Sequence, residues 1–270
     1  MLPKFSVLMS IYNKEEEKNL LECLDSLKKQ LVKPTETIIV YDGPIRKELD
    51  DIIEKYSTAL NIIKIKLEKN VGLGQALNIG LTHCKNEIIA RMDTDDIAIP
   101  SRFKIQLSYF SKDPDLAVLG SNIDEFIIST SETTGTRKVP SEYNDIKKYA
   151  LFKCPLNHMT VMFRKKIVQD VGSYIHHHYM EDYNLWLRIL ASNHKILNVE
   201  QSLVYARVNK NTLLRRRGLS YIKSEYKLAK LKKSLKLQKR VSSILTFILR
   251  ASPRLLPPFI LKLIYKINRD

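Results

Sequence analysis

The sequence predicts an α/β protein in which helices cover the faces of a mostly parallel central sheet. The first observation is an alternation, within the first hundred residues, of β-rich apolar segments and helix-spaced apolar stripes. Such alternation is typical of parallel strands joined by crossover helices. The second observation is a charge excess confined to the carboxyl-terminal end, which predicts a basic helical tail attached to this body.

Four strands are predicted in the amino-terminal half, and each is followed by a polar loop. The strands cover residues 5–11, 37–42, 62–67 and 87–92. Apolar stripes at residues 20–31 and 45–56 predict helices between the first three strands. Because ligands bind beyond the carboxyl ends of parallel strands, the four loops should share one ligand-binding rim. These loops comprise residues 10–13, 41–43, 70–74 and 93–96.

The pattern is less regular after Pro100. A helix is predicted from Pro100 to about Tyr109, and another over residues 180–190. Further strands are predicted at residues 116–121, 125–129 and 157–163. Residues 130–142 are polar and threonine-rich, and we predict a surface loop there that orders on ligand binding.

Length and composition place the chain among globular proteins. Its 270 residues are 44% hydrophobic and 27% charged, enough to bury a sizeable core. The first apolar run is short and lacks a cleavage site, so no secretion signal is predicted. Cys23, Cys84 and Cys154 lie far apart and are predicted to be reduced packing residues, which fits a cytoplasmic location.

The net charge of +16 is unevenly divided along the chain. Residues 201–270 hold 18 lysines and arginines against two acids, whereas residues 1–200 hold 27 charges of each sign. We therefore predict a neutral body, residues 1–207, and a basic tail, residues 208–270, that meets an anionic surface.

Three acids follow the fourth predicted strand. Asp93, Asp95 and Asp96 place three mutually repelling carboxylates within four residues. Oxygen ligands of this kind suit a hard divalent cation such as Mg²⁺ or Mn²⁺, which leaves coordination positions open for phosphate. The alternative is that Asp95 or Asp96 caps the helix that begins near Pro100.

Each of two other loops of the rim can be interpreted either as a structural turn or as a ligand contact. The segment Asn70–Gly74 resembles a dinucleotide-binding loop but lacks the third glycine. It is either a turn that needs positive φ before a helix, or a close backbone approach to a ligand. Asp42 either holds a ribose or base, or begins a turn with Gly43.

A second acidic site lies at the start of the helix predicted over residues 180–190. Glu181 or Asp182 either accepts a proton from a hydroxyl nucleophile or caps the helix. The run His176–His178 is assigned to a loop, because consecutive histidines cannot all face one ion. His158 is a core histidine, a metal ligand or a phosphate contact, and the sequence leaves these three open.

Five motifs in a fixed order resemble those of family 2 glycosyltransferases. They are Ser6–Asn13, Val40–Gly43, Asn70–Gly72, Asp93–Asp96 with Pro100–Phe103, and Glu181–Arg188. Each motif is weak alone, but the ordered series covers residues 5–207. The resemblance implies an A-type glycosyltransferase fold, with a nucleotide-binding half at about residues 1–100 and an acceptor half at about 101–207. It also implies inverting transfer from a nucleotide sugar, usually a UDP-sugar.

The same resemblance assigns roles to individual residues. Asp93 and Asp95 would hold a divalent cation, Mn²⁺ or Mg²⁺, and Asp182, paired with Glu181, would be the catalytic base. Asp42 would hold the uridine. The residues implied to contact the donor are Ser10, Tyr12, Asn13, Asp42, Asn70, Gly72, Arg91 and Asp93. The cation would stabilise the departing diphosphate while Asp182 deprotonates an acceptor hydroxyl, so a single displacement inverts the anomeric carbon.

Departures from the wider family narrow the expected reaction. The glutamine-rich motif of processive members is absent and no transmembrane helix follows, which favours transfer of a single sugar. Short members of this kind resemble bacterial enzymes that build O-antigen or capsule repeat units on a lipid diphosphate carrier. Two other functions stay open. One is a sugar nucleotidyltransferase, whose glycine-rich basic first loop is absent here, and the other is a non-catalytic basic protein that binds membranes or polyanions.

The tail mixes basic and apolar residues. Residues 211–240 are rich in lysine and arginine, while residues 244–249 and 259–267 are apolar but far shorter than the ~20 residues that cross a bilayer. We predict amphipathic helices that lie peripherally on the anionic inner face of the cell membrane. The alternatives are a charged face packed on the body and nucleic-acid binding, which is disfavoured because no recognised module is present.

Overall fold

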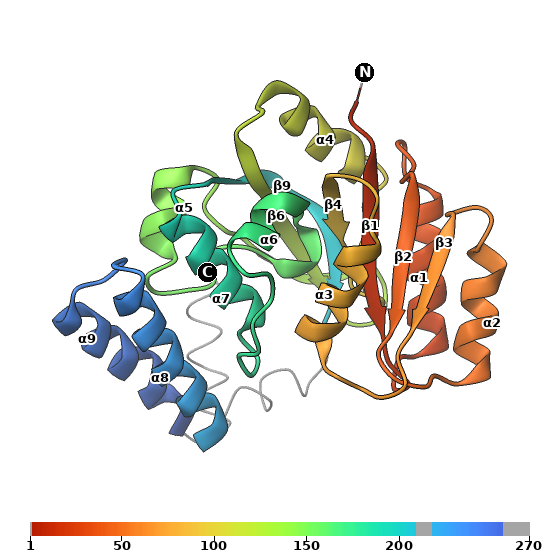
Figure 1. The fold of residues 1–270 in the computed structure, drawn as a ribbon. Helices are drawn as coiled ribbons and strands as arrows, with labels where there is room; N and C mark the ends of the chain where they lie inside the picture. The colour runs from red at the N-terminus through yellow and green to blue at the C-terminus, as the bar shows by residue number, and fades with distance from the viewer. Residues whose placement is uncertain (1, 209–217, 256–270) are drawn as a thin grey trace.

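The computed structural model describes residues 2–208 and 218–255 (Figure 1). Within these ranges one nine-stranded sheet has the order β3-β2-β1-β4-β8-β6-β9-β5, with β7 paired to β6. The strands are β1 (Phe5–Ile11), β2 (Glu36–Tyr41), β3 (Ile62–Lys66), β4 (Ile88–Arg91), β5 (Ile97–Ala98), β6 (Leu116–Phe126), β7 (Thr133–Arg137), β8 (Met162–Arg164) and β9 (Lys195–Arg207). The helices are α1 (Glu17–Lys28), α2 (Lys47–Tyr56), α3 (Leu73–His83), α4 (Arg102–Lys112), α5 (Tyr143–Tyr149), η1 (His158–Thr160), α6 (Lys165–Asp170), α7 (Glu181–Ala191), α8 (Leu219–Ser234), α9 (Arg240–Ala251) and η3 (Ser252–Leu255).

The four amino-terminal strands form the parallel half of the sheet. Strand β1 lies between β2 and β4, and β3 lies outside β2, all in parallel register. Val7 of β1, for example, is level with Thr37 of β2 and Ala90 of β4. The carboxyl ends of all four strands therefore meet at one edge, as predicted. Antiparallel pairing begins beyond β4, where β8 runs antiparallel to both β4 and β6.

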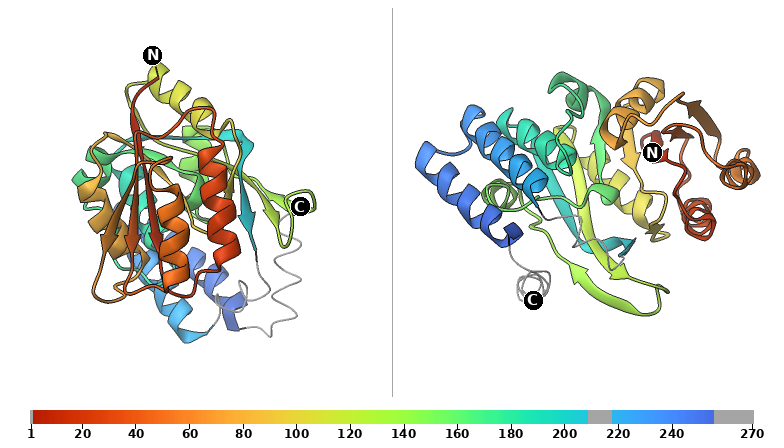
Figure 2. Two further views of the ribbon diagram at one scale, coloured as in Figure 1. Left: turned by 90° about the vertical axis from the view of Figure 1, so that its right-hand side faces the viewer. Right: turned by 90° about the horizontal axis from the view of Figure 1, so that it is seen from below.

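Helices cover both faces of the sheet (Figures 1 and 2), and an apolar core lies on each face. Phe5, Val7 and Met9 of β1 pack with residues of α1, α2 and α4 on one face. Leu8 points to the other face and packs with residues of α3 and α7. Helix α3 approaches the sheet most closely at Gly80, where a Cβ atom would lie 2.5 Å from Leu8 Cδ1. The layers thus hold β1, and the loop that follows it, rigidly in the centre of the body.

Two strand predictions are wrong around β6. The two strands predicted between residues 116 and 129 are one continuous strand, β6. Ser121 and Asn122 suggested a break because they are polar, but both are buried and hydrogen-bonded. Asn157 Nδ2 donates to Ser121 O at 2.9 Å, and Asn122 Oδ1 accepts from Val139 N at 2.8 Å. Local polarity therefore did not end the strand, since tertiary partners satisfy it.

The region after β6 also differs from the prediction. The surface loop predicted at residues 130–142 contains β7, and the β6–β7 hairpin extends outward from the body (Figure 2). Its threonines and glycine lack the apolar alternation that identifies strands. The strand predicted at residues 157–163 is the short helix η1 followed by β8, because Thr160 Oγ1 donates to Asn157 O at 2.8 Å and turns the chain.

The described part of the tail consists of α8, α9 and the short helix η3, and α8 and α9 lie beside α5 and α7 (Figure 1). Tyr221 and Leu228 of α8 join the core that contains α7, and buried Glu225 forms an ion pair with Arg250 of α9 at 2.6 Å. No helix in the described ranges is long and apolar enough to cross a bilayer. The tail segments predicted at residues 211–217 and 259–267 lie outside the described residues, and the boundary near residue 207 stays a prediction.

Candidate active site

The loops at the carboxyl edge of the parallel strands are connected to one another, as predicted. Asp42, after β2, donates its backbone N–H to Ile11 O of β1 at 2.8 Å. The Asp42 carboxylate in turn accepts from the backbone N–H of Val71, after β3, at 2.6 Å. Thr94 Oγ1, after β4, donates to the carboxylate of Glu15, after β1. All four predicted rim loops therefore belong to one hydrogen-bonded network.

Asp42 holds the loop that leads into α3. Its second carboxylate oxygen accepts from Gly72 N at 3.1 Å, and Asn70 Nδ2 donates to Asp42 O at 3.1 Å. Gly43 has a φ of +89°, and a Cβ atom there would lie 2.8 Å from Asn70 N. Gly72 also has a φ of +89° and precedes α3, which confirms the turn interpretation of this loop. Its approach to a ligand stays a prediction.

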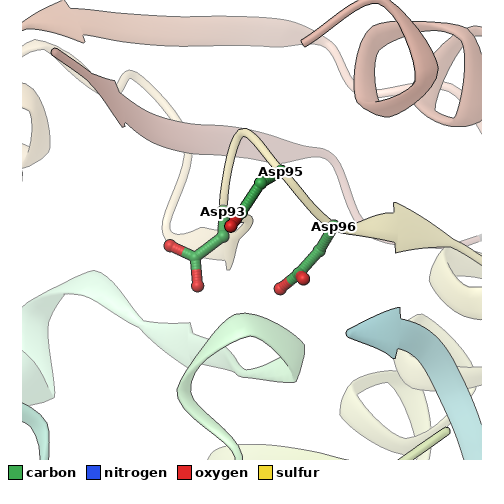
Figure 3. Close-up of side chains that lie close together, drawn as sticks. All are labelled: Asp93, Asp95 and Asp96. Carbon is green, nitrogen blue, oxygen red and sulfur yellow. The ribbon is translucent and has the colours of Figure 1, made fainter. Parts of the chain in front are cut away.

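Asp93, Asp95 and Asp96 form an acidic triad on the loop between β4 and β5 (Figure 3). One carboxylate oxygen from each lies within 4.8 Å of the others. Cys23 Sγ donates to Asp93 O at 3.2 Å and fixes the start of the loop. Ser101 is the N-cap of α4, so the interpretation of Asp95 or Asp96 as its cap is wrong.

Burial and mutual repulsion disfavour the ionised triad. Burial, followed by repulsion from Asp93 and Glu15, raises the pKa of Asp95 to about 7. The pKa of Asp96 is raised as well, by burial and then by Asp95. Asp96 Oδ1 accepts from Arg207 N at 2.8 Å, but Asp96 Oδ2 is buried and has no hydrogen-bond partner in the described part of the chain. The side chains and backbone of the protein therefore stabilise only part of the negative charge of the triad.

Arg91 lies beneath the triad at the end of β4. Its side chain is buried, and Nη2 donates to Asp93 Oδ1. Its charge lowers the pKa of Asp95, Asp96 and Asp182, so it acts on both acidic sites. The Nε and Nη1 atoms of Arg91 are buried without a partner among the described residues. One guanidinium thus offsets part of the charge of three carboxylates.

Asp182 is the more isolated acid and lies in the first turn of α7. Burial raises its pKa, while the Tyr183 N–H and the positive charges of Arg137 and Arg91 stabilise its ionised form. Cys154 Sγ lies 3.6 Å from Asp182 Oδ2 and can donate to it. The N-cap of α7 is Met180, so Asp182 does not occupy the cap position, but it lies in the first turn, where the helix dipole favours a carboxylate. A half-buried carboxylate with a raised pKa is suited to accepting a proton.

Glu181 connects the two halves of the site. A Cβ atom on Gly74, at the start of α3, would lie 3.2 Å from Glu181 Cγ. Burial raises the pKa of Glu181, and His176 Nδ1 lies 3.9 Å from its carboxylate. The amino-terminal ends of α3 and α7 therefore pack against each other across the site.

Tyr174, hydrogen-bonded to His158, lies near both acidic sites. His158 Nε2 is hydrogen-bonded to the Tyr174 hydroxyl at 2.8 Å. The carboxylates of Asp182 and Asp93 both raise the pKa of Tyr174, so both lie near its side chain. Burial lowers the pKa of His158 well below its usual value, which keeps the imidazole neutral. Among the interpretations of His158, the hydrogen-bonded core histidine agrees with this geometry, although the residue is only half-buried.

The other predicted donor residues lie on the rim. Ser10 is half-buried at the end of β1, while Tyr12, 45% exposed, and Asn13 follow it at the surface. Their contacts with a donor stay predictions. The run His176–His178 forms a loop, as predicted, and His177 is buried with Nε2 2.9 Å from Ser224 O of α8.

Four residues of the site were not predicted, and one of them is Tyr174, the partner of His158. Glu15 contacts the triad loop through Thr94, and Arg137 and Cys154 act on Asp182. Arg137 lies on β7, in the region expected to be a loop, and Cys154 was assigned to packing alone. Only Glu15 had a signal in the sequence, as an acid in the first rim loop.

The oxygen atoms of the triad fit a hard divalent cation. Three carboxylates lie together at the ligand edge, and the buried Asp96 Oδ2 has no partner among the residues that the structure describes, a contact that a cation would supply. The chemistry of the set, with oxygen donors and no sulfur or imidazole, matches Mg²⁺ or Mn²⁺.

Comparison with known sequences identifies glycosyltransferases as relatives of this chain. The family model described as "Glycosyl transferase family 2" matches residues 6–172. The amylovoran biosynthesis glycosyltransferase AmsE of Erwinia amylovora is 42% identical, over 98% of this chain and 99% of its own. An Escherichia coli protein named UDP-Gal:alpha-D-GlcNAc-diphosphoundecaprenol beta-1,3-galactosyltransferase is also 42% identical, over 83% of this chain and 82% of its own.

Solved structures share the fold. Staphylococcus aureus TarS in complex with UDP-GlcNAc superposes with a TM-score of 0.70 at 21% identity, covering 92% of this chain and 72% of that chain. The mannosyltransferase PcManGT from Pyrobaculum calidifontis, in complex with GDP-Man and Mn²⁺, gives a TM-score of 0.66 at 14% identity, covering 99% and 80%. At these identities the likeness concerns the fold alone. The chain has the A-type glycosyltransferase fold, as the motif series predicted, and it belongs to glycosyl transferase family 2.

Proposed function

We propose that this glycosyltransferase moves one sugar from a UDP-sugar to a hydroxyl of a lipid-diphosphate-linked saccharide during assembly of a bacterial surface polysaccharide such as O-antigen or capsule. Its relatives support the proposal, because one is named for amylovoran biosynthesis and another for galactose transfer to GlcNAc-diphosphoundecaprenol. The observation that carries it is that Asp182 and the Asp93 carboxylate of the acidic triad both act on the side chain of Tyr174, so the two acidic sites belong to one site.

The donor is proposed to bind along the rim. Asp42 is nearly buried and already fixes the loop at Gly72, so a uridine would meet a preformed surface there. Ser10, Tyr12 and Asn13 would contact the nucleotide from the loop after β1. Asn70, Gly72 and Arg91, with Asp93, complete the proposed set. TarS, which shares the fold, binds UDP-GlcNAc, and this supports a UDP-sugar in the same place.

Asp93 and Asp95 are proposed to hold a divalent cation, Mn²⁺ or Mg²⁺, with Asp96 beside them. When bound, the cation would supply positive charge to the leaving diphosphate. PcManGT, which shares the fold, carries Mn²⁺ with its donor. Arg91 would keep the Asp93 carboxylate oriented through the hydrogen bond from Nη2.

Asp182 is proposed to be the catalytic base, with Glu181 as its neighbour in the site. Its raised pKa makes it a better proton acceptor than an exposed aspartate, and the Cys154 thiol orients one of its oxygens. Asp182 would take the proton of the acceptor hydroxyl as that oxygen attacks the anomeric carbon. A single displacement of this kind inverts the configuration at that carbon.

The basic tail is proposed to keep the enzyme peripheral on the inner, cytoplasmic face of the membrane, where a lipid-linked acceptor resides. Residues 218–255 hold ten lysines and arginines and a single acid, and anionic headgroups attract such a segment by about 1 kcal/mol per nearby cation.

Product analysis tests the proposed reaction. Full-length protein is incubated with UDP-Gal, UDP-Glc or UDP-GlcNAc and a GlcNAc-diphosphate-lipid acceptor, with Mn²⁺ or with EDTA. We expect acceptor-dependent release of UDP that EDTA abolishes. Release of pyrophosphate instead would identify a sugar nucleotidyltransferase. No product with any donor, from a folded protein, would leave a non-catalytic binding protein.

A further inference from the structure

Helix α9 turns its apolar side away from the protein. Five of its large aliphatic residues are between 50% and 69% exposed. They recur at the i, i+3, i+4, i+7 and i+8 positions of one helix face, which we call the outer stripe. The outer stripe consists of Val241, Ile244, Leu245, Ile248 and Leu249.

The side of α9 that faces the protein is polar. Ser243 is buried and its hydroxyl donates to Ala229 O of α8 at 2.8 Å. Thr246 is buried too, and its hydroxyl accepts from Gln238 Nε2 at 3.1 Å. This is the reverse of an ordinary surface helix, which packs its apolar stripe on the core. A contiguous apolar surface left outside in this way marks an interaction site.

Exposed cations lie on the neighbouring helix α8 and on the turn that leads into α9. The exposed side of α8 presents a row of lysines, and the turn into α9 adds more positive charge. The exposed cations are Lys223, Lys227, Lys230, Lys233, Lys236, Lys239 and Arg240. Tyr226 of α8 connects the two surfaces, because its ring packs edge-on against Phe247 of α9 at 5.8 Å while Lys230 lies over it at 4.7 Å.

The charge distribution selects the partner. Lys239 and Arg240 stand at the amino-terminal end of α9, where the helix dipole disfavours positive charge. The single acid of residues 218–255, Glu225, is buried and bonded to Arg250. Pairing of two copies through the outer stripe would bring two strongly positive surfaces together. A surface that is both apolar and anionic can bury the outer stripe and pair with the cations at the same time.

We infer that the outer stripe of α9 inserts into the interface of an anionic lipid bilayer, with the lysines of α8 and Arg240 at the headgroups and Tyr226 at the boundary. The inference rests on the proposed function, because an enzyme that acts on a lipid-linked acceptor has to bind at the membrane surface. It goes further by naming the helix face that enters the lipid. Helix α8 then serves as the spacer that joins α9 to α7.

Vesicle flotation tests the docking surface without donor, acceptor or catalysis, so its result does not depend on the proposed reaction. We expect full-length protein to float with phosphatidylglycerol-containing vesicles and much less with pure phosphatidylcholine. The double variant Leu245→Gln and Ile248→Gln should bind the anionic vesicles at least about tenfold more weakly. The control Leu31→Gln removes an exposed leucine that lies outside the tail, and this variant should bind the anionic vesicles like wild type.

A tryptophan placed in the outer stripe reports insertion directly. The chain has one native tryptophan, Trp186, which is buried and gives a constant background. Ile248→Trp should shift its emission to the blue with anionic vesicles and be quenched by brominated lipid, whereas Leu31→Trp should not. Both substitutions are at exposed positions, and circular dichroism confirms that each variant is folded.

Three results would overturn the inference. One is equal binding of the double variant and wild type to anionic vesicles, and another is equal binding of wild type to neutral and anionic vesicles. The third is a wild-type dimer in buffer, by light scattering, that the double variant converts to monomer, since that would assign the outer stripe to self-association.

Discussion

Two acidic sites lie near Tyr174, and the protein holds them in opposite ways. The triad gathers three carboxylates on one loop, where burial, and then repulsion from neighbouring acids, raises the pKa of Asp95 and Asp96. Asp182 is a single acid on a helix, raised in pKa mainly by burial and stabilised by Arg137 and Arg91. The comparison teaches that crowding builds a place for a positive ligand, whereas isolation builds a proton acceptor.

The largest expected effect is that of Asp182→Asn, which should lower the turnover rate without weakening nucleotide binding. Asp182→Asn keeps the size of the side chain but removes the proton acceptor, so the turnover rate should fall by about 10²- to 10⁴-fold. Binding of UDP with Mn²⁺ should stay close to wild type, because the triad is untouched. Initial rates of UDP release and calorimetric titration measure the two properties. Asp145→Asn, an exposed acid on α5, is the matched control, and equal turnover in both variants would remove Asp182 from its role.

A substitution in the triad should weaken cation binding and leave the chemical step largely intact, which is the opposite of Asp182→Asn. Asp95→Asn removes one of the charges proposed to hold the cation, so the Mn²⁺ concentration needed for half-maximal activity should rise by about 10- to 100-fold. Saturating Mn²⁺ should restore much of the turnover, which no concentration does for Asp182→Asn. Activity measured across a Mn²⁺ series shows this. An unchanged requirement for Mn²⁺ would contradict the assignment of Asp95.

The triad also depends on its supporting loop, whereas Asp182 is held by a helix. Thr94→Val removes the hydroxyl that donates to the buried Glu15 carboxylate, and should lower the free energy of unfolding by about 1 kcal/mol. Urea denaturation measures the loss, with the exposed Thr58→Val as the control. Equal midpoints for both variants would show that this hydrogen bond does not stabilise the rim.

The smallest effect is a shift in pH dependence. The base must be ionised, so activity falls as pH drops through the pKa of Asp182, which lies above that of an ordinary aspartate. Arg137→Gln removes a charge that lowers this pKa, so the acid limb of kcat/KM should move to higher pH. Arg91, Glu181 and Cys154 also face Asp182 and are unchanged in this variant.

The exposed neighbour Lys138 provides the control for this test. Lys138→Gln removes the same charge from a side chain that does not act on Asp182. Its pH profile should overlay that of wild type. An acid limb that stays in place in both variants would contradict the electrostatic coupling between Arg137 and Asp182.

The parallel half of the fold was predictable because its signals are local. Apolar runs and helix-spaced stripes identified β1 to β4 with α1 and α2, and the ends of parallel strands placed Asp42 and the triad on one rim. Strand β7 was missed because its threonines and glycine show no alternation. Strand β6 was divided because Asn122 is polar, although its partner Val139 satisfies it from outside the strand.

The missing parts of the site depend on contacts between distant residues. Arg137 and Cys154 act on Asp182 only because β7 and the segment before η1 fold back against α7. In the tail, the sequence predicted amphipathic helices but could not say which face packs on the body. Helix α8 packs Leu228 inward, whereas α9 leaves Leu245 outside, and only tertiary docking decides between these arrangements.

Direct titration of full-length protein with Mn²⁺, followed by electron paramagnetic resonance with and without UDP, tests the central claim that the triad exists to hold a cation against a nucleotide diphosphate. We expect one Mn²⁺ to bind, more tightly when UDP is present, in wild type and in Asp182→Asn alike, with binding greatly weakened in Asp95→Asn. Absence of bound Mn²⁺ from folded wild type, or equal binding by Asp95→Asn, would contradict the claim.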